Sequence, residues 1–396
     1  MLILFHMEST QLNLRHLRAM AAIARLGSVT AAAQAISITQ PAITQALAKL
    51  ESQLGHQLFE RRPDGMTNLA AATIFAPRVE AALGHIGSRR VTMASLRAMI
   101  ALADSGSYAE ASATTGLAQP SLHRAVRDLS LALKRTLVER RGKGIALTEH
   151  GRRAARAFRL ARAELDSGLS ELAALAGRET GRIAIGAMPL CRARLLPNAV
   201  AAFHQKHPES EVVIVEGSFR ELIEPLRDGV IDAMIGALRP TAPSEDVVQS
   251  ELFVDRLVVL GRKDHPLAKL AGDIATMDLA RFPWTISAPG TPLRIQWEQM
   301  FTSAGVTPPR IPVESGSVIA NREILRKSDF LTLFSPDQVA VELEAGWLTK
   351  ICEAPGNLER TIGTTTRAGW RPTVMQSSFL QLLQEAANSI KLNKNL

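Results

Sequence analysis

Residues 17–62 read LRAMAAIARLGSVTAAAQAISITQPAITQALAKLESQLGHQLFERR, and the same pattern returns 79 positions later over residues 96–141. The two segments align without a gap and are identical at 18 of 46 positions. Self-similarity at a fixed spacing is the signature of a duplicated structural unit. The chain therefore starts with two versions of one small domain, called copy one and copy two below.

Each copy contains the start and stop signals of short helices. In copy one, apolar residues recur at helical spacing up to Gly27, which ends the first helix, and Ser28 is a good N-cap for the next. Thr39 precedes Gln40-Pro41, and proline is tolerated in a first helical turn. In copy two, Ser107 to Glu110 has the capping-box spacing. Two helices joined by a short turn, the second opening with polar side chains, predict a helix-turn-helix.

The second helix of this motif in copy one carries side chains suited to DNA. Its apolar stripe of Ile43, Leu47 and Leu50 is expected to be buried, which leaves a polar face exposed. Glutamine can bond adenine at two atoms, and threonine can contact a thymine methyl group or a phosphate. Residues 61–65, Arg-Arg-Pro-Asp-Gly, are interpreted as the basic tip of a wing. The predicted DNA contacts are Ser28, Thr39, Gln40, Pro41, Thr44, Gln45, Lys49, Arg61 and Arg62.

Copy two presents a more basic version of the same surface. Its wing, residues 140–144, reads Arg-Arg-Gly-Lys-Gly. The predicted DNA contacts of this copy are Gln119, Ser121, His123, Arg124, Arg127, Arg140, Arg141 and Lys143. For either copy the alternative is a solvated helix face beside a basic loop. Repetition of the complete pattern favours DNA binding in both.

The positive charge of the chain is concentrated where the copies lie. Residues 1–180 hold 23 Lys and Arg against 14 Asp and Glu, whereas residues 181–396 hold 23 against 24. The net charge of +8 therefore comes from the first half. A localised basic excess suits a phosphate backbone, because each neutralised phosphate releases counterions.

Length and composition narrow the class of protein. A chain of 396 residues is expected to form roughly two to four domains. Two cysteines are too few for a disulfide framework or a metal cluster, which fits a reducing compartment. The apolar run at residues 1–5 is too short for a secretory signal, and no apolar stretch approaches the roughly 20 residues of a membrane span. We therefore expect a cytoplasmic protein that does not bind membranes.

Taken together, the motifs of copy one resemble the DNA-binding segment of LysR-type transcription regulators. The family normally has Thr-x-x-Gly after the wing, and this motif is lost in copy one but present in copy two as Thr148-Glu149-His150-Gly151. Because a family member normally has one such domain, the sequence leaves open which copy reads the operator. The resemblance rests on Leu14-Arg15-His16-Leu17, Gly27-Ser28, Ala31-Ala32, Thr39-Gln40-Pro41-Ala42-Ile43-Thr44, Leu50-Glu51, Leu54-Gly55 and Leu58-Phe59-Glu60-Arg61.

A long amphipathic stretch follows copy two at residues 152–176, with apolar residues at spacings of three and four. It resembles the linker helix of the family, which pairs between protomers. The alternative is a helix packed within its own domain. Copy one has a shorter equivalent near Ile74–Leu83. The resemblance implies double-stranded DNA as a partner, a homo-dimer or homo-tetramer, and contact with RNA polymerase.

From Arg182 onward, short strands alternate with helices. The order of Ile183–Ile185, Leu195–His207 and Glu211–Val215 predicts a parallel, doubly wound sheet, in which ligands bind at the carboxyl ends of strands. These segments resemble the LysR effector domain, which is similar to the two-lobed type 2 periplasmic binding proteins. The closing Gly369-Trp370-Arg371-Pro372-Thr373 resembles a branch of the family named after a galactose-binding-protein regulator.

Polar residues after strands and before helices are the candidates for an effector site. Thr291 is predicted to cap a helix whose exposed amides can bind an anion, and Arg294 can pair with a carboxylate. These groups favour a small, anionic effector. For each residue the alternative is a simple cap or turn. The predicted effector contacts are Leu190, Cys191, Arg192, Ser218, Thr291, Arg294, Ser315 and Ser317.

The expected architecture is multidomain, with two all-α winged helix-turn-helix domains and an α/β, two-lobed effector domain like a periplasmic binding protein. The function predicted is sequence-specific DNA binding controlled by a small-molecule effector, and the alternative is an architectural DNA-binding protein without ligand control. No nucleophile–base pair, metal-ligand spacing or phosphate loop occurs, so neither catalysis nor a cofactor is expected. The expected boundaries are 12–70 and 91–151 for the two copies, 71–90 for their connection, 152–177 for the linker helix and 181–396 for the effector domain, with lobe I at 181–258 and 352–396 and lobe II at 262–348.

Overall fold

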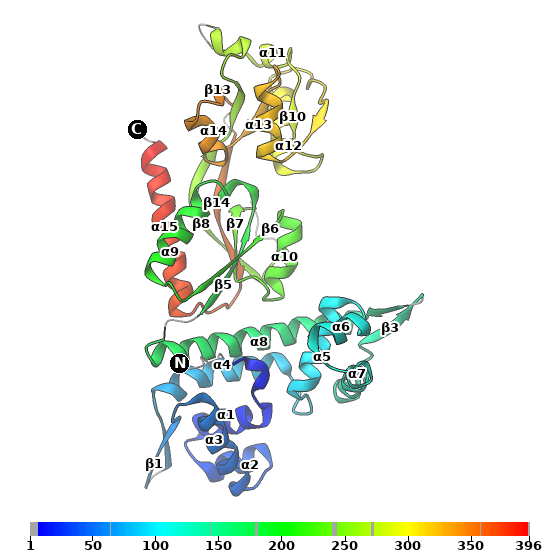
Figure 1. Ribbon diagram of the computed structural model, residues 1–396, viewed down its shortest axis with the longest axis vertical. Helices are drawn as coiled ribbons and strands as arrows, with labels where there is room; N and C mark the ends of the chain where they lie inside the picture. Colours follow the sequence, from blue (N-terminus) through cyan, green and yellow to red (C-terminus); the bar gives the residue numbers. More distant parts are fainter. Residues whose placement is uncertain are drawn as a thin grey trace.

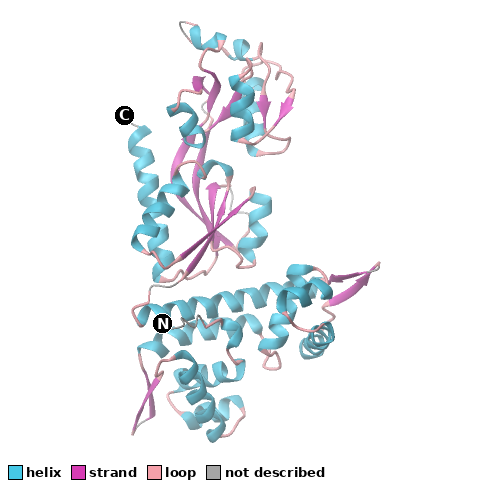
Figure 2. Cartoon of the chain, in the orientation of Figure 1, coloured by secondary structure: helices cyan, strands magenta, loops and turns pink. Residues whose placement is uncertain are grey.

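The computed structural model places a helical body at the N-terminal half and two α/β lobes at the C-terminal half (Figure 1). In the helical body, the described strands are confined to two short hairpins, as Figure 2 shows. Lobe I rests on the helical body and lobe II lies beyond it. The structure describes residues 7–63, 65–142, 144–178, 181–239, 244–270, 273–356 and 358–394.

Copy one folds as three helices followed by a β-hairpin wing. The side chains of Ser28 and Thr39 accept hydrogen bonds from first-turn amides of α2 and α3, which confirms both predicted N-caps. Gly27 and Gly55 end α1 and α3 in the left-handed conformation that glycine adopts without strain. The elements are η1 (Ser9–Gln11), α1 (Leu14–Leu26), α2 (Val29–Ile36), α3 (Gln40–Leu54), β1 (Phe59–Arg62) and β2 (Gly65–Asn68).

Copy two repeats this arrangement with different caps. Ser107 accepts a hydrogen bond from the Glu110 amide, but the reciprocal bond of a capping box is formed one helix earlier, between Thr92 and Ser95. The helix equivalent to α3 starts after Ala118, whose side chain cannot cap it. The elements are α5 (Met93–Ser105), α6 (Tyr108–Thr115), α7 (Gln119–Leu133), β3 (Val138–Arg141) and β4 (Gly144–Leu147).

Two long helices, α4 (Ala70–Ile86) and α8 (Glu149–Leu175), run antiparallel to each other and join the copies (Figure 1). Helix α4 is longer than the predicted Ile74–Leu83, because it starts at Ala70 and continues past Gly84 to its C-cap at Gly87. Pro77 lies inside this helix without ending it. The sequence predicted that the helix after copy two pairs with a second protomer. In the structure, this helix packs against α4 of the same chain, as the alternative interpretation allowed.

A single hydrophobic core runs through both copies and both long helices. Side chains of α1, α5, α4 and α8 contribute to it, so the cores of the two copies are continuous through the long helices. Removing one copy would therefore expose apolar surface on the rest of this body. The free-energy cost is about 25 cal/mol for each Å² of apolar surface exposed. Its fully buried members include Leu17, Ile23, Phe75, Val79, Leu96, Met99, Phe158, Ala161 and Leu165.

Lobe I is a five-stranded sheet with the order β6-β5-β7-β14-β8. Strand β5 pairs in parallel with β6 and β7, as the βαβ pattern predicted, whereas β14 is antiparallel to β7 and β8. Helices α9 and α15 pack against each other on one side, and α10 lies on the other (Figure 1). The elements are β5 (Arg182–Ala187), η2 (Pro189–Cys191), α9 (Leu195–Lys206), β6 (Glu211–Glu216), α10 (Phe219–Arg227), β7 (Ala233–Ala237), β8 (Val247–Arg256), β14 (Glu359–Arg367) and α15 (Val374–Lys394).

Lobe II is built around a three-stranded sheet and a cluster of aromatic side chains. The sheet has the order β12-β9-β13, and Trp284, Trp297 and Phe301 meet edge to face in the core. The chain crosses between the lobes twice, from β8 to β9 and from β13 to β14. The elements are β9 (Val258–Arg262), η3 (Pro266–Lys269), α11 (Thr276–Leu279), β10 (Thr285–Ile286), α12 (Pro292–Thr302), β11 (Val313–Glu314), α13 (Val318–Arg326), β12 (Thr332–Phe334), η4 (Asp337–Val339), α14 (Ala340–Glu344) and β13 (Leu348–Glu353).

Ion pairs fix lobe I to helix α8. Arg156 and Arg159 of α8 both contact the carboxylate of Asp228, at 2.7 Å in each case. Arg159 also contacts Asp104 of α5 at 2.5 Å, so one arginine joins copy two, α8 and lobe I. Among the described residues, no helix combines the length and apolar character needed to cross a bilayer.

Candidate DNA-binding surface and effector cleft

Helix α3 exposes the polar face predicted to contact DNA. Ile43, Leu47 and Leu50 are buried as expected, and the predicted contact residues on the other face are exposed. The Gln40 amide nitrogen donates a hydrogen bond to the Thr30 hydroxyl at 2.9 Å, which restricts its orientation. The exposed contact residues are Thr39, Gln40, Pro41, Thr44, Gln45 and Lys49, whereas Ser28 is half-buried as a cap.

The wing of copy one is fastened to the end of α1. The Met66 amide donates to the Gly27 carbonyl at 2.8 Å, and the Asn68 side chain donates to the Ala24 carbonyl at 3.3 Å. Gly65 has a φ of 144°, and a Cβ atom placed on it would lie 2.4 Å from the Gly27 carbonyl oxygen. This close approach of two backbones requires glycine.

The two arginines of this wing differ in their surroundings. Both Arg61 and Arg62 are exposed, as DNA contacts must be. Arg62 pairs with Glu60 at 2.7 Å, so part of its charge is already balanced within the chain. Exposed ion pairs of this kind contribute about 0–1 kcal/mol to the stability of the fold. Arg62 can therefore exchange this pair for a contact with a DNA phosphate. Asp64, at the tip, lies outside the described residues.

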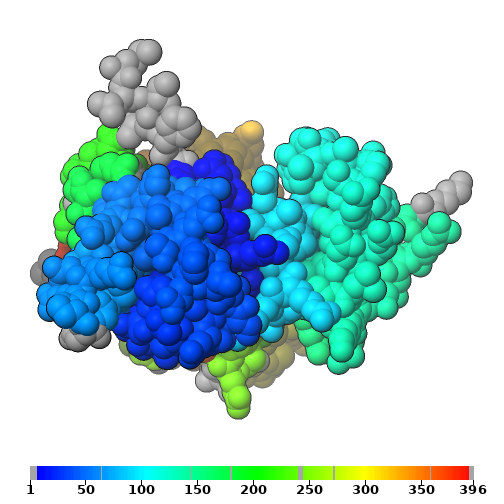
Figure 3. All heavy atoms as spheres, turned by 90° about the horizontal axis from the view of Figure 1, so that it is seen from below, coloured from blue at the N-terminus to red at the C-terminus, as the bar shows by residue number. Residues whose placement is uncertain are grey.

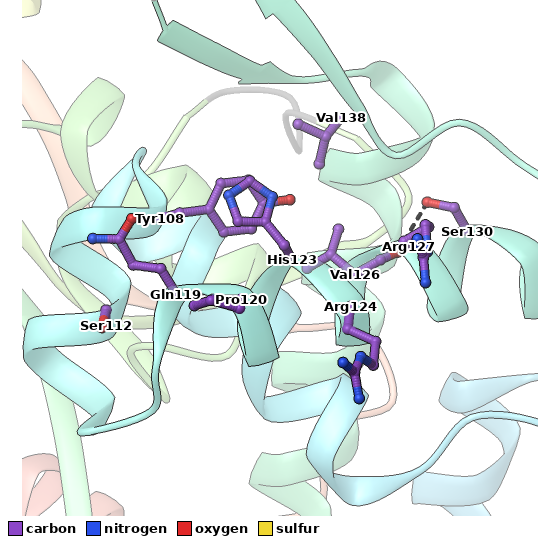
Figure 4. A pocket seen from close by; sticks show the side chains of 10 residues that line it. All are labelled: Tyr108, Ser112, Gln119, Pro120, His123, Arg124, Val126, Arg127, Ser130 and Val138. Carbon is purple, nitrogen blue, oxygen red and sulfur yellow. Dashed lines mark hydrogen bonds between the residues drawn. The ribbon is translucent and has the colours of Figure 1, made fainter.

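Helix α7 exposes a different set of side chains. The five predicted residues on this helix are exposed, and His123 stacks on Tyr108 of α6 with ring centroids 3.6 Å apart and planes 26° apart (Figure 4). Burial raises the pKa of the Tyr108 hydroxyl. Sequence reasoning missed Tyr108, although the repeat aligns it with Val29 and aligns His123 with Thr44. The predicted α7 residues are Gln119, Ser121, His123, Arg124 and Arg127.

A groove lies over the exposed face of α7, between α6 and the wing strand β3 (Figure 4). Arg124 and Arg127 contribute guanidinium groups to it, and Gln119 contributes an amide. Arg127 lies 3.9 Å from the Asp128 carboxylate, a loose pair that leaves its charge largely available. The groove thus combines positive charge, an amide and a stacked aromatic pair.

The wing of copy two projects from the body rather than lying on it (Figure 1). Within the described part of the chain, no hydrogen bond like that between Met66 and Gly27 joins this wing to the end of α5. A Cβ atom on Gly144 would meet nothing closer than a carbonyl oxygen at 3.9 Å. Arg140 and Arg141 are exposed, and Lys143 lies outside the described residues.

The two copies lie side by side on the face of the molecule that is turned away from the effector domain. Figure 3 shows copy one in blue and copy two in cyan and green, with their wings at opposite ends of this face. The predicted DNA contacts that the structure describes lie in the segments that build this face. A surface of this kind can follow one DNA duplex with both copies.

Lobe I buries two of the predicted effector residues and holds a third in hydrogen bonds and an ion pair. Leu190 and Cys191 are buried in the core of the lobe, and the Cys191 thiol donates to the Met188 carbonyl at 3.1 Å. Burial raises the pKa of Cys191 to about 12, which keeps the thiol protonated and unreactive. Arg192 donates to the Ala187 carbonyl at 2.8 Å and pairs with Glu216 at 3.1 Å.

Two arginines that sequence reasoning missed lie at the carboxyl ends of β6 and β7. Ser218 is exposed and forms a capping box with Glu221 at the start of α10, and Arg220 follows it. Arg239 lies 4.5 Å above the ring of Phe219. Burial and the neighbouring charge of Arg220 lower the pKa of the Arg239 guanidinium. The sequence signal that could have identified both arginines is their position shortly after a strand.

Lobe II presents helix N-termini rather than free charge. Thr291 caps α12 as predicted, and its hydroxyl also contacts the Ser287 hydroxyl at 2.7 Å. Arg294 is already held by Glu298 at 2.7 Å and lies 3.7 Å from the carboxylate of Glu314. The charge predicted to meet a ligand is therefore balanced by the chain itself.

The two predicted serines of lobe II form the cap of α13. The Ser317 hydroxyl accepts a hydrogen bond from the Ala320 amide at 3.3 Å, and the Ser315 hydroxyl accepts one from the Ser317 amide at 3.2 Å. Both residues thus have structural roles at a helix N-terminus. Within the described ranges, no group of three or more His, Cys, Asp or Glu side chains is placed to hold a metal ion.

Comparison with protein families identifies both halves of the chain. The model described as the bacterial regulatory helix-turn-helix protein, lysR family, matches residues 14–72 and again residues 93–152. The model of the LysR substrate binding domain matches residues 176–388. Both copies are therefore matched by the same family model.

Individual relatives agree with the family matches. The HTH-type transcriptional regulator GalR of Pseudomonas putida is 31% identical over 90% of this chain and 93% of its own length. The regulator PcaQ of Agrobacterium fabrum is 27% identical over 97% of its own length but only 76% of this chain.

Solved structures give the same fold. A full-length OxyR variant from Pseudomonas aeruginosa superimposes with a TM-score of 0.56 at 22% identity, covering 75% of this chain and 97% of that one. Full-length CbnR complexed with its target DNA gives a TM-score of 0.53 at 20% identity, covering 74% of this chain and 98% of that one.

Proposed function

Because the chain belongs to the LysR family of DNA-binding transcription regulators with effector-binding domains, we propose that α3 supplies most of its base readout and that a small organic anion binds between the lobes. The exposed polar face of α3 carries the first part of this proposal, since Gln40 is oriented by Thr30. The arginines of α7 are better suited to phosphates, which fix position without reading sequence. The proposed setting is the cytoplasm, with RNA polymerase as a further partner.

Substitutions on α3 test the base readout. Gln40→Ala is expected to weaken specific operator binding by about 1–3 kcal/mol while non-specific binding survives. Arg61→Ala is expected to weaken binding to every sequence and to flatten the salt dependence, because it removes a phosphate contact. Gel shifts of promoter DNA and random DNA across a salt series measure both effects. Equal losses on both DNAs for Gln40→Ala would mean that α3 does not read bases.

The anionic effector is supported by the charges at the edge of lobe I. Arg220 and Arg239 follow β6 and β7, the two strands that flank β5, and ligands bind at such strand ends in open α/β sheets. Arg239 is half-buried and stacked on Phe219, so its guanidinium is held in place before a ligand arrives. The N-termini of α12 and α13 in lobe II add amide donors that favour negative charge.

A metabolite screen tests this site. Small carboxylates are titrated into the protein, and thermal stability and operator binding are recorded. The ligand that acts on the wild type is expected to lose its effect in Arg239→Gln, which removes the charge but keeps most of the side chain. Arg281→Gln is a control, because its side chain is 74% exposed beyond the end of α11.

The outcome also separates the regulator from the architectural alternative. A carboxylate that shifts the melting temperature through Arg239 supports ligand control. A ligand that acts equally on the wild type and Arg239→Gln places the site elsewhere. If no carboxylate changes stability or DNA binding, an architectural role without ligand control accounts for the two helix-turn-helix copies better.

A further inference from the structure

We propose that one chain alone forms a complete, paired DNA-reading unit, so that its target is a directional DNA element with two unlike half-sites. In this unit α4 occupies the place beside α8 that a second protomer was expected to fill. The inference rests on the proposed function in one respect: α3 and α7 must both contact DNA. The arguments come from the contact between α4 and α8, from the connection of the copies, and from their recognition helices.

The contact between the long helices is closely packed. Gly168 is buried in the middle of α8, and a Cβ atom placed on it would lie 2.6 Å from the ring of Phe75 in α4. Glycine inside a helix is unfavourable unless a close approach requires it. Here it lets the ring of Phe75 lie against the backbone of α8. This face of α8 is therefore occupied within the chain.

A buried charge fastens the same contact. Arg78 of α4 is 5% exposed and pairs with Glu171 at 2.6 Å and with Glu164 at 3.2 Å, both on α8. It also donates to the backbone carbonyl of Arg371 in the effector domain at 2.9 Å. Replacing Arg78 while the helices stay packed would leave buried carboxylate charge without its partner, which is strongly unfavourable.

Copy one is also hydrogen-bonded to the segment that leads into copy two, which restrains the position of α3 relative to α7. Arg18 of copy one donates to the Ser88 carbonyl at 2.9 Å, in the short segment between α4 and α5. Arg89 of this segment donates back to the Ala35 carbonyl of α2 at 3.4 Å. With the shared hydrophobic core, these bonds make copy one a rigid part of the unit rather than a tethered extra domain.

The two reading helices, α3 and α7, carry different side chains on their solvent-exposed faces. Thr44 of α3 corresponds to His123 of α7, and Thr39 corresponds to Ala118. In addition, His123 is stacked on Tyr108, where copy one has Val29. A symmetric pair of identical domains reads a palindrome, because the symmetry of the DNA site mirrors that of the protein. Two unlike helices at a fixed distance instead select two unlike half-sites in a fixed order.

Rearranged DNA tests this inference on the unmodified full-length protein. The operator is first mapped by footprinting and base-substitution interference on the promoter beside its own gene. Two palindromic duplexes are then made, each with one half-site repeated and inverted in place of the other. We expect both palindromes to bind at least tenfold more weakly than the natural element. Equal or tighter binding to either palindrome would overturn the inference.

Substitutions in α3 and α7 provide a second test, in which base-substitution interference is measured again on the mapped operator. We expect Gln40→Ala to abolish base interference in one half-site only, and His123→Ala to change it only in the other. Loss of interference in both half-sites from one substitution would mean that two chains contribute the same copy, and the inference would fail. If the wild type binds promoter DNA no better than random DNA, the proposed function fails and the paired unit fails with it.

Discussion

Copies one and two share their buried framework but differ on the surface and in the attachment of their wings. The wing of copy one is bonded to the end of α1 through Gly27, whereas among the described residues the wing of copy two has no such hydrogen bond to the end of α5. Positions identical in the repeat include Leu17, Met20 and Leu50, which are buried, together with their counterparts in copy two. The duplication has kept the scaffold and some predicted DNA contacts, such as Gln40 and Gln119, while others, such as Thr44 and His123, have diverged. Unequal roles within one rigid unit follow from this difference.

The largest difference between the copies concerns the long helices. Arg78 of α4 is buried between two glutamates, whereas the 79-residue repeat places Ala157 at the same position of α8. Arg78→Ala is expected to lower the free energy of unfolding by about 3 kcal/mol, because it removes the arginine that pairs with Glu171 and leaves Glu164 with Arg371 alone. Denaturant unfolding measures this loss.

Arg153→Ala is the matched control for this change. Its side chain is 72% exposed in a pair with Glu149, and such pairs contribute about 0–1 kcal/mol. Similar losses from both substitutions would show that α4 is not held to α8 by Arg78.

The next difference is the attachment of the wings. Gly65→Ala places a methyl group against the Gly27 carbonyl in a strained backbone conformation and is expected to cost about 2 kcal/mol. Gly144→Ala at the equivalent position of copy two meets no close atom and is expected to change stability little. Thermal unfolding of both variants measures the difference. Equal melting temperatures would mean that both wings are free.

The smallest difference lies at the end of the reading helices. Gly55 follows α3 with a φ of 67°, whereas copy two has Lys134 there with a φ of 54°. A residue with a Cβ atom is less stable by about 1–2 kcal/mol in this conformation. Lys134→Gly is therefore expected to raise the free energy of unfolding by about 1 kcal/mol, and Gly55→Ala to lower it, in the same denaturant measurement. A destabilising Lys134→Gly would contradict this account of the helix end.

Sequence patterns were sufficient to predict the helices and strands and most of their exposed faces. The repeat, the caps Ser28 and Thr39, and the βαβ order all depend on local spacing, and the structure confirms them. The buried stripe of α3 follows from helical periodicity alone. Local physical chemistry therefore fixed what each segment forms.

Long-range pairing was beyond the same reasoning. An amphipathic helix has the same pattern whether its partner belongs to its own chain or to another, so the pairing of α8 with α4 was not predictable. The neutralisation of Arg294 and the stack of His123 on Tyr108 depend in the same way on residues brought close by folding. The sequence also suggests deletion of residues 1–88 as a test of copy one, but the shared core makes that deletion unsuitable, because it would expose Phe158 and Leu165 of α8.

The mass of the protein–DNA complex tests the central claim most directly. Native mass spectrometry of the full-length protein on a duplex containing one mapped bipartite element counts the chains bound. We predict that one chain protects both half-sites and that the complex has the mass of one chain plus one duplex. A complex in which two chains are required to protect one bipartite element would contradict the account.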